Sequence, residues 1–180
     1  MTEFLAMSKV KKNSGIVVMS KTIIIDNLFD NSLIQNALEK LGSSNVSESW
    51  YSINSNHNFK FLCESLLNEC FNFYDLNECV GYEYWTQNNT RPSNWHYDKD
   101  EMYYESTGLF KYPICSIVYY LKVNNLEGGL LHLEDITILP KTNRLVIFPS
   151  GIKHYVEEFS GDRVSFLINP WSYNISLGTT

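Results

Sequence analysis

The chain has 180 residues, which is enough for one domain and too few for two ordinary ones. Hydrophobic residues make up 44% of the sequence and aromatic residues 14%, so the chain can fill a real core, and its β-branched and aromatic content favours strands. The formal net charge of −6 disfavours nonspecific binding to nucleic acids or anionic membranes, because phosphate contacts need clustered lysines and arginines. We therefore expect neither a nucleic-acid partner nor a membrane.

The N-terminal residues and the cysteines indicate the compartment. Residues 1–20 contain no apolar run of signal-peptide length, and no stretch of the chain approaches a membrane span. The cysteines show no CxxC pairing, so we expect free buried thiols, with a structural disulfide or a cysteine metal site as the alternative. A reducing cytoplasm is the expected location.

The first part of the chain predicts one strand and two helices. Residues 16–25 are rich in β-branched residues and predict a strand. A helix is expected over about 32–41, closed by Gly42. The longest helix is expected over 58–74, where apolar residues at helical spacing predict a buried face. These residues are Phe61, Leu62, Leu66, Cys70 and Phe73.

From Val80 onwards the sequence changes to short β-type runs separated by turn-forming residues. The runs are VGYEYW, YPICSIVYYLKV, GGLLHLED, RLVIFP, IKHYVEEF and RVSFLINPW. Strands of this length and frequency indicate a β-sandwich or jelly roll. We expect one domain over 1–180 that is mainly β with N-terminal helices (α+β). Supporting elements would occupy about 16–78, and the jelly-roll core about 79–172.

A candidate metal site begins with the segment NWHYD. His96 and Asp98 are two residues apart, so on an extended chain they point to the same side, and His154 lies in another expected strand. Two imidazoles and one carboxylate can hold one face of an octahedral iron(II) ion and leave three positions open. Zinc could bind the same three side chains, although a structural zinc normally takes four protein ligands. Without a metal, His96 would be a surface loop residue and His154 a strand histidine with no ligand role.

A candidate anion site follows His154. Arg163 comes nine residues later, past the glycine and aspartate at 161–162, which we expect to form a turn between two antiparallel strands. Such a turn would bring the guanidinium beside the metal, where it could grip a dicarboxylate with two parallel hydrogen bonds. Ser165 shares its face and could add a hydroxyl. The alternative for Arg163 is a surface salt bridge.

The segments WHYD, KHYV and GDRVS together resemble the iron(II)/2-oxoglutarate oxygenase superfamily, and within it the prolyl-4-hydroxylase-like branch. The family pattern is HxD, a distal histidine, and then an arginine or lysine about nine or ten residues later. The segments SIVYYLK and EGGLLHLED look like the family strand and paired-glycine turn, which places Tyr120 at the tyrosine that helps to bind the 2-oxoglutarate carboxylate. The resemblance covers about residues 80–172. It implies a double-stranded β-helix, which is a form of jelly roll.

Two departures limit what the resemblance implies. Lys122 stands where the family usually has asparagine, and residues 82–95 do not align clearly with the family segment that shapes the substrate pocket. The aromatic residues there either line a pocket or belong to the core, and Tyr84 or Tyr82 could contact the co-substrate. The aromatic residues are Tyr82, Tyr84, Trp85 and Trp95. We expect His57 and His132 to be exposed loop and strand residues and not ligands.

The resemblance implies a hydroxylase that uses Fe(II), O2 and 2-oxoglutarate. In that family the oxidation of a substrate C–H bond is coupled to the decarboxylation of 2-oxoglutarate to succinate. The substrate would be an amino acid, a peptide or protein, or another small molecule. A non-catalytic jelly-roll binding module and a metal-dependent hydrolase of cupin type are the competing interpretations.

Overall fold

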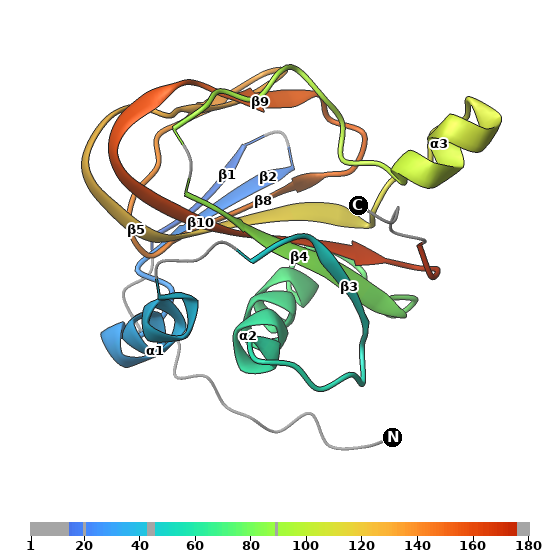
Figure 1. The fold of residues 1–180 in the computed structure, drawn as a ribbon, viewed down its shortest axis with the longest axis horizontal. Helices are drawn as coiled ribbons and strands as arrows, with labels where there is room; N and C mark the ends of the chain where they lie inside the picture. The colour runs from blue at the N-terminus through green and yellow to red at the C-terminus, as the bar shows by residue number, and fades with distance from the viewer. Residues whose placement is uncertain (1–14, 20, 43–45, 89, 176–180) are drawn as a thin grey trace.

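A computed structural model describes residues 15–19, 21–42, 46–88 and 90–175 (Figure 1). The helices are α1 (Asn31–Leu41), α2 (Lys60–Phe71) and α3 (Glu101–Thr107). The strands are β1 (Ile16–Met19), β2 (Thr22–Asp26), β3 (Ser49–Ser52), β4 (Gly81–Gln87), β5 (Cys115–Gly128), β6 (Leu131–Leu133), β7 (Thr137–Ile138), β8 (Arg144–Pro149), β9 (His154–Val156) and β10 (Phe159–Trp171).

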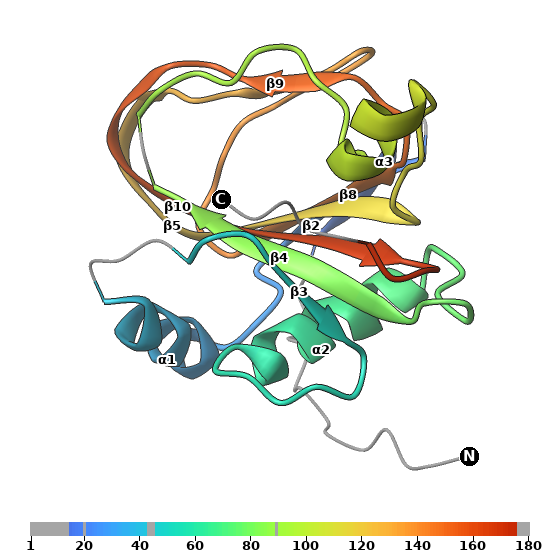
Figure 2. The ribbon, with the colours of Figure 1, turned by 45° about the vertical axis from the view of Figure 1, so that its right-hand side comes forward.

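The strands form two sheets that face each other. The larger sheet has seven strands in the order β1-β2-β8-β5-β10-β4-β3, and the smaller one has three in the order β7-β6-β9. All strand pairs are antiparallel. Figures 1 and 2 show α1 and α2 beneath the larger sheet and the smaller sheet on its other side. The expected jelly roll with N-terminal helices is confirmed.

Alternating residues of the central strands supply two separate cores. On one face of the larger sheet, residues such as Tyr119 and Phe166 pack against the apolar sides of α1 and α2. On the other face, Val118, Tyr120 and Phe148 pack against the smaller sheet. Successive strand side chains point to opposite faces, so one strand contributes to both cores. The second face also carries the candidate site.

The smaller sheet is connected to the larger one through a sharp bend of β5 and β10, which both figures show on the left. The register of the two strands shifts between Ser160 and Asp162, and Gly161 lies at this bulge with a φ of +93°. The prediction of a turn at Gly161 is therefore wrong, because β10 continues through this residue. β9 pairs with β6 and not with β10. A glycine in the left-handed region serves a bulge as readily as a turn.

Replacing Gly161 with alanine is expected to destabilise the fold by about 1–3 kcal/mol, the typical cost of a strained backbone position. A Cβ there would lie 2.1 Å from the backbone oxygen of Asn125, at a φ that disfavours side chains. Urea unfolding monitored by circular dichroism measures the change. Gly15→Ala is the control, because a Cβ at Gly15 meets nothing within 4 Å. Equal stability of the two variants would contradict a role of Gly161 in the bend.

The N-terminal elements agree with the sequence in part. The helices expected over 32–41 and 58–74 are α1 and α2, and Gly42 closes α1 as expected. The strand expected over 16–25 is instead the hairpin of β1 and β2. In α2 Leu62, Leu66 and Cys70 are buried as expected, but Phe61 is exposed, and Phe73 is exposed beyond the end of the helix at Phe71. A helix buries only the stripe that faces the sheet.

The cysteines are free thiols, as expected, and three of the four are buried. Among the described residues, no helix is long and apolar enough to cross a membrane.

Candidate active site

Three side chains from two segments meet at the edge of the smaller sheet. The ligand atoms of His96, Asp98 and His154 all lie within 4.8 Å of one another. The backbones of His96 and His154 form an antiparallel bridge with two reciprocal hydrogen bonds of 2.9 Å. Asp98 follows two residues later on the same side of the chain, with its Oδ1 3.6 Å from the Nε2 of His154. The fold thus brings together the three side chains that we expected to bind a metal.

Both imidazoles are held with the same nitrogen directed away from the backbone. The Nδ1 of His96 lies 2.7 Å from the carbonyl oxygen of Asn94, and the Nδ1 of His154 lies 3.0 Å from that of Ile152. A carbonyl only accepts, so each Nδ1 carries the proton and each Nε2 keeps its lone pair for a metal. Burial lowers the pKa of His154, which favours the neutral form that binds metals.

The carboxylate of Asp98 is fixed by a residue that sequence reasoning missed. The hydroxyl of Ser116 donates a hydrogen bond of 2.5 Å to Oδ2 of Asp98, which leaves Oδ1 on the side of His154. Ser116 is buried in β5, on the same face as Tyr120. Strand alternation counted back from Tyr120 is the signal that would have found it.

Replacing Ser116 with alanine is expected to weaken iron(II) binding by about 10–100-fold, the usual effect of removing a group that orients a metal ligand. The carboxylate of Asp98 would lose its hydroxyl donor and rotate more freely. Anaerobic titration with iron(II) measures the affinity. Ser165→Ala is the control, because Ser165 also lines the cavity and makes no hydrogen bond with Asp98. Wild-type iron affinity in Ser116→Ala would show that Asp98 needs no such support.

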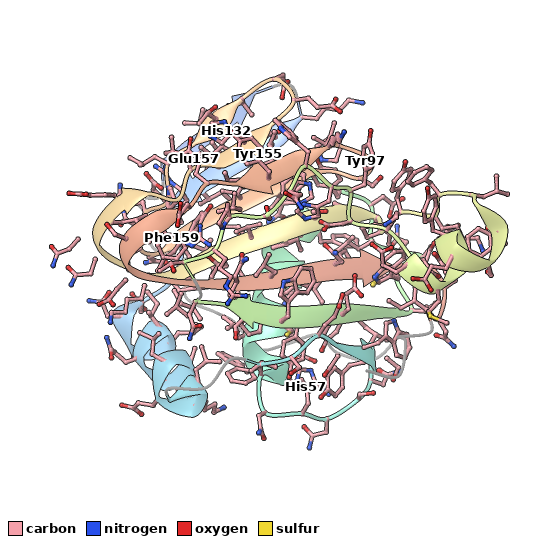
Figure 3. The ribbon with its side chains drawn as sticks, turned by 45° about the horizontal axis from the view of Figure 1, so that its top comes forward. His57, Tyr97, His132, Tyr155, Glu157 and Phe159 are labelled. Carbon is pink, nitrogen blue, oxygen red and sulfur yellow. The ribbon has the colours of Figure 1, made fainter. Side chains whose placement is uncertain are left out.

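A cavity of about 100 Å³ connects the three candidate ligands to Arg163. Arg163 is 2% exposed and extends from β10, near the bend of the sheets. Its Nη1 donates to the carbonyl oxygen of Gly129 at 3.1 Å, while its Nε has no partner. The ring of Phe159, labelled in Figure 3, lies 4.2 Å from the guanidinium carbon.

The charge of Arg163 is not balanced within the part of the chain that the structure describes, where no carboxylate forms an ion pair with it. Burial lowers the pKa of Arg163, but an arginine side chain stays charged in proteins. A buried charge without a counter-ion is costly, so this arrangement calls for an anion in the cavity.

Tyr120 and Ser165 line the same cavity as Arg163. They face each other across β5 and β10, since their Cα atoms are register partners. Burial raises the pKa of Tyr120 to about 12, so its hydroxyl stays protonated and can donate a hydrogen bond. The structure therefore brings both residues to the place where an anion bound by Arg163 would lie.

The structure places Tyr84 away from the candidate site. The prediction that Tyr84 contacts the co-substrate is therefore wrong. Tyr84 lies on the opposite face of β4, where it stacks on Phe166 with ring centroids 5.3 Å apart. The neighbouring Trp85 lines the cavity instead. Tyr82 is likewise in the helix-side core, and Trp95 is exposed.

The remaining histidines, His57 and His132, lie apart from the candidate metal ligands as expected, but both are half-buried and not exposed. Figure 3 shows His57 at the far side of the larger sheet, whereas His132 lies beside Tyr155 and Glu157 on the smaller sheet. The ring of His57 is 4.2 Å from that of Tyr51, and Nε2 of His132 is 2.6 Å from a carboxylate oxygen of Glu157. Neither belongs to the ligand cluster.

Comparison with solved structures shows the same fold in prolyl hydroxylases. A prolyl-4-hydroxylase from Pseudomonas putida has a TM-score of 0.58 at 16% sequence identity, with 86% of this chain and 89% of that one covered. The viral collagen prolyl hydroxylase from Paramecium Bursaria Chlorella virus-1, in complex with 2OG, has a TM-score of 0.56 at 14% identity, covering 84% and 96%. A prolyl hydroxylase from Trichoplax adhaerens, in complex with a peptide fragment of the hypoxia inducible factor oxygen degradation domain, has a TM-score of 0.58 at 16% identity, covering 84% of each chain.

The sequence itself matches one family model. A comparison with curated proteins found no match. The model of the 2OG-Fe(II) oxygenase superfamily matches residues 82–173, which is more than half of the chain and includes all of the cavity-lining residues named above. The chain therefore belongs to the 2OG-Fe(II) oxygenase superfamily.

Proposed function

We propose that this chain is a hydroxylase that holds iron(II) with His96, Asp98 and His154 and anchors 2-oxoglutarate with Arg163. One observation carries the proposal: a single cavity joins three ligand side chains to a buried guanidinium that has no carboxylate partner among the described residues. An iron ion needs the first group, and the distal carboxylate of a 2-oxo diacid needs the second.

The donor set fits these two groups. Two Nε2 lone pairs and one carboxylate oxygen are free on one side of the ligand cluster, and a facial triad of this kind leaves positions open. When bound, iron(II) and 2-oxoglutarate supply the oxidation of a C–H bond by O2, with release of succinate and carbon dioxide. The chain's own part is to hold these groups in place and to exclude water, which the apolar side chains of Val118, Leu131 and Leu167 do along the cavity wall.

The cavity leaves little room for a substrate beside 2-oxoglutarate. Pockets that enclose a drug-sized ligand usually measure about 300–1,000 Å³, and this one measures about 100 Å³. His96 is on the open side of the ligand cluster, where it is exposed. A peptide or protein that inserts one side chain from outside suits this geometry better than an enclosed small molecule. The peptide complex of the Trichoplax prolyl hydroxylase supports the same choice. A cytoplasmic location without a nucleic-acid partner remains part of this proposal.

Production of succinate tests the function. The purified protein, loaded with iron(II) under air, is expected to convert 2-oxoglutarate to succinate slowly alone and faster with a peptide that it oxidises. Peptide pools are screened for a mass gain of one oxygen. A binding module would give no succinate, and a cupin-type hydrolase would change a substrate without consuming 2-oxoglutarate. Complete absence of succinate with bound iron would therefore contradict the proposal.

A further inference from the structure

Gln87 is a polar cavity residue that none of the roles above uses. It is the last residue of β4, and its register partner on β10 is Ser165, which in turn pairs with Tyr120 on β5. Register partners in antiparallel strands point to the same face, so Gln87, Ser165 and Tyr120 form one polar row across three strands. All three line the cavity.

Gln87 also contacts the buried guanidinium. Its side-chain oxygen lies 3.5 Å from Nη2 of Arg163, at the outer limit of a hydrogen bond. The other acceptor for Arg163 is the carbonyl oxygen of Gly129. Both acceptors are neutral, so they orient the guanidinium and leave its charge uncompensated. When the oxygen of the Gln87 amide faces Arg163, its NH2 group is free to donate into the cavity.

We propose that Gln87 strengthens the preference for a 2-oxo diacid over a 2-oxo monoacid that the charge of Arg163 creates. Its amide oxygen orients Arg163, and its NH2 group donates to the distal carboxylate that Arg163 binds. This inference rests on the proposed function, since it assumes that Arg163 is the anchor. The neutrality of Gln87 is as important as its hydrogen bonds, because an acidic side chain here would pair with Arg163 and occupy the place of the ligand's carboxylate.

Two substitutions separate these contributions. Gln87→Glu keeps the length of the side chain and adds a carboxylate 3.5 Å from the guanidinium, so it should compete directly with the diacid. Gln87→Met keeps the length and removes only the hydrogen-bonding groups. Asn88→Asp is a charge-matched control, because Asn88 is the next residue, is exposed and does not line the cavity.

The test is an anaerobic titration of each iron(II)-loaded protein with 2-oxoglutarate and with 2-oxopentanoate, which has the same carbon chain and no distal carboxylate. The visible band of the complex reports binding without turnover. Gln87→Glu is expected to weaken 2-oxoglutarate binding by about a hundredfold or more, because an internal ion pair must be broken. Gln87→Met should weaken it by about three- to tenfold, the effect of one lost hydrogen bond. The affinity for 2-oxopentanoate should stay at the wild-type value in both variants.

Several results would overturn the inference. Wild-type affinity for 2-oxoglutarate in Gln87→Glu would show that Gln87 does not face the anion. Equal losses for the diacid and the monoacid would indicate general damage to the site, and an equal loss in Asn88→Asp would indicate a long-range effect of charge. If the wild-type protein binds iron(II) but no 2-oxoglutarate, the proposed function fails together with this inference. If the wild-type protein binds 2-oxoglutarate and both Gln87 variants bind it equally well, the proposed function stands and the inference alone is wrong.

Discussion

His96→Ala and His154→Ala are each expected to weaken iron(II) affinity by more than about a hundredfold. Removing a group that only hydrogen-bonds to a metal ligand already lowers metal affinity by about 10–100-fold, and these substitutions remove a ligand itself. Each substitution removes one of two Nε2 atoms that the backbone carbonyls hold toward the other ligands. The remaining histidine and Asp98 would offer only two protein ligands. Anaerobic iron(II) titration and metal analysis after gel filtration measure the loss.

His132 and His57 provide matched controls for these variants. His132 interacts with Glu157 on the outside of the smaller sheet, and His57 interacts with Tyr51 and Tyr82 beyond the larger sheet. Alanine at either position removes an imidazole from the same chain without touching the ligand cluster, so iron binding should persist. Normal iron binding in both His96→Ala and His154→Ala would refute the assignment of the ligands.

Arg163→Ala is expected to weaken 2-oxoglutarate binding by about 2–5 kcal/mol, the cost of removing one partner of a buried charged pair. Arg163 is the buried cation of the cavity, and its Nε has no partner in the described part of the chain. Arg163→Lys should recover part of the affinity, because it keeps the charge and loses the planar pair of donors. Tyr120→Phe should cost about 1 kcal/mol, since it removes one hydroxyl and keeps the packing of the ring.

The control is Arg144→Ala, because Arg144 is paired with Asp26, with 2.6 Å between Nε and Oδ1, and does not line the cavity. Titration of 2-oxoglutarate into each anaerobic iron complex gives the affinities. Iron binding without 2-oxoglutarate should barely change in any variant. Unchanged 2-oxoglutarate affinity in Arg163→Ala would place the anchor elsewhere.

The sequence predicted correctly which residues of an extended segment share one face. His96 and Asp98 lie on one side of an extended segment, and Arg163 and Ser165 lie on one face of β10, as their spacing of two predicts. Which face of β4 points to the cavity was not predictable, because both faces are largely buried and each carries a large aromatic ring. The sequence therefore does not distinguish Tyr84 from Trp85 as the residue that faces the cavity, and in the structure it is Trp85.

The pairing of the strands was less predictable than their existence. Gly161 predicted a hairpin that would carry Arg163 beside His154, and the real connection is different. β10 reaches the site by pairing with β5 and β4 and bending at Gly161. The same residue type permits a tight turn and a bulge, and only the distant partner strand decides between them.

The backbone bridge between His96 and His154 holds the candidate ligands together whether or not a metal is bound. Its two hydrogen bonds, and a third of 3.0 Å from the Ser93 amide to the carbonyl oxygen of Val156, attach the ligand-bearing segment to β9 without any help from a metal. In zinc fingers the ion itself drives folding, so that chelators denature the domain. Here the ligands are preorganised by main-chain pairing. Removing the metal with a chelator should therefore abolish turnover of 2-oxoglutarate reversibly. The circular dichroism should stay unchanged, and the amides of His96 and His154 should stay protected from hydrogen exchange.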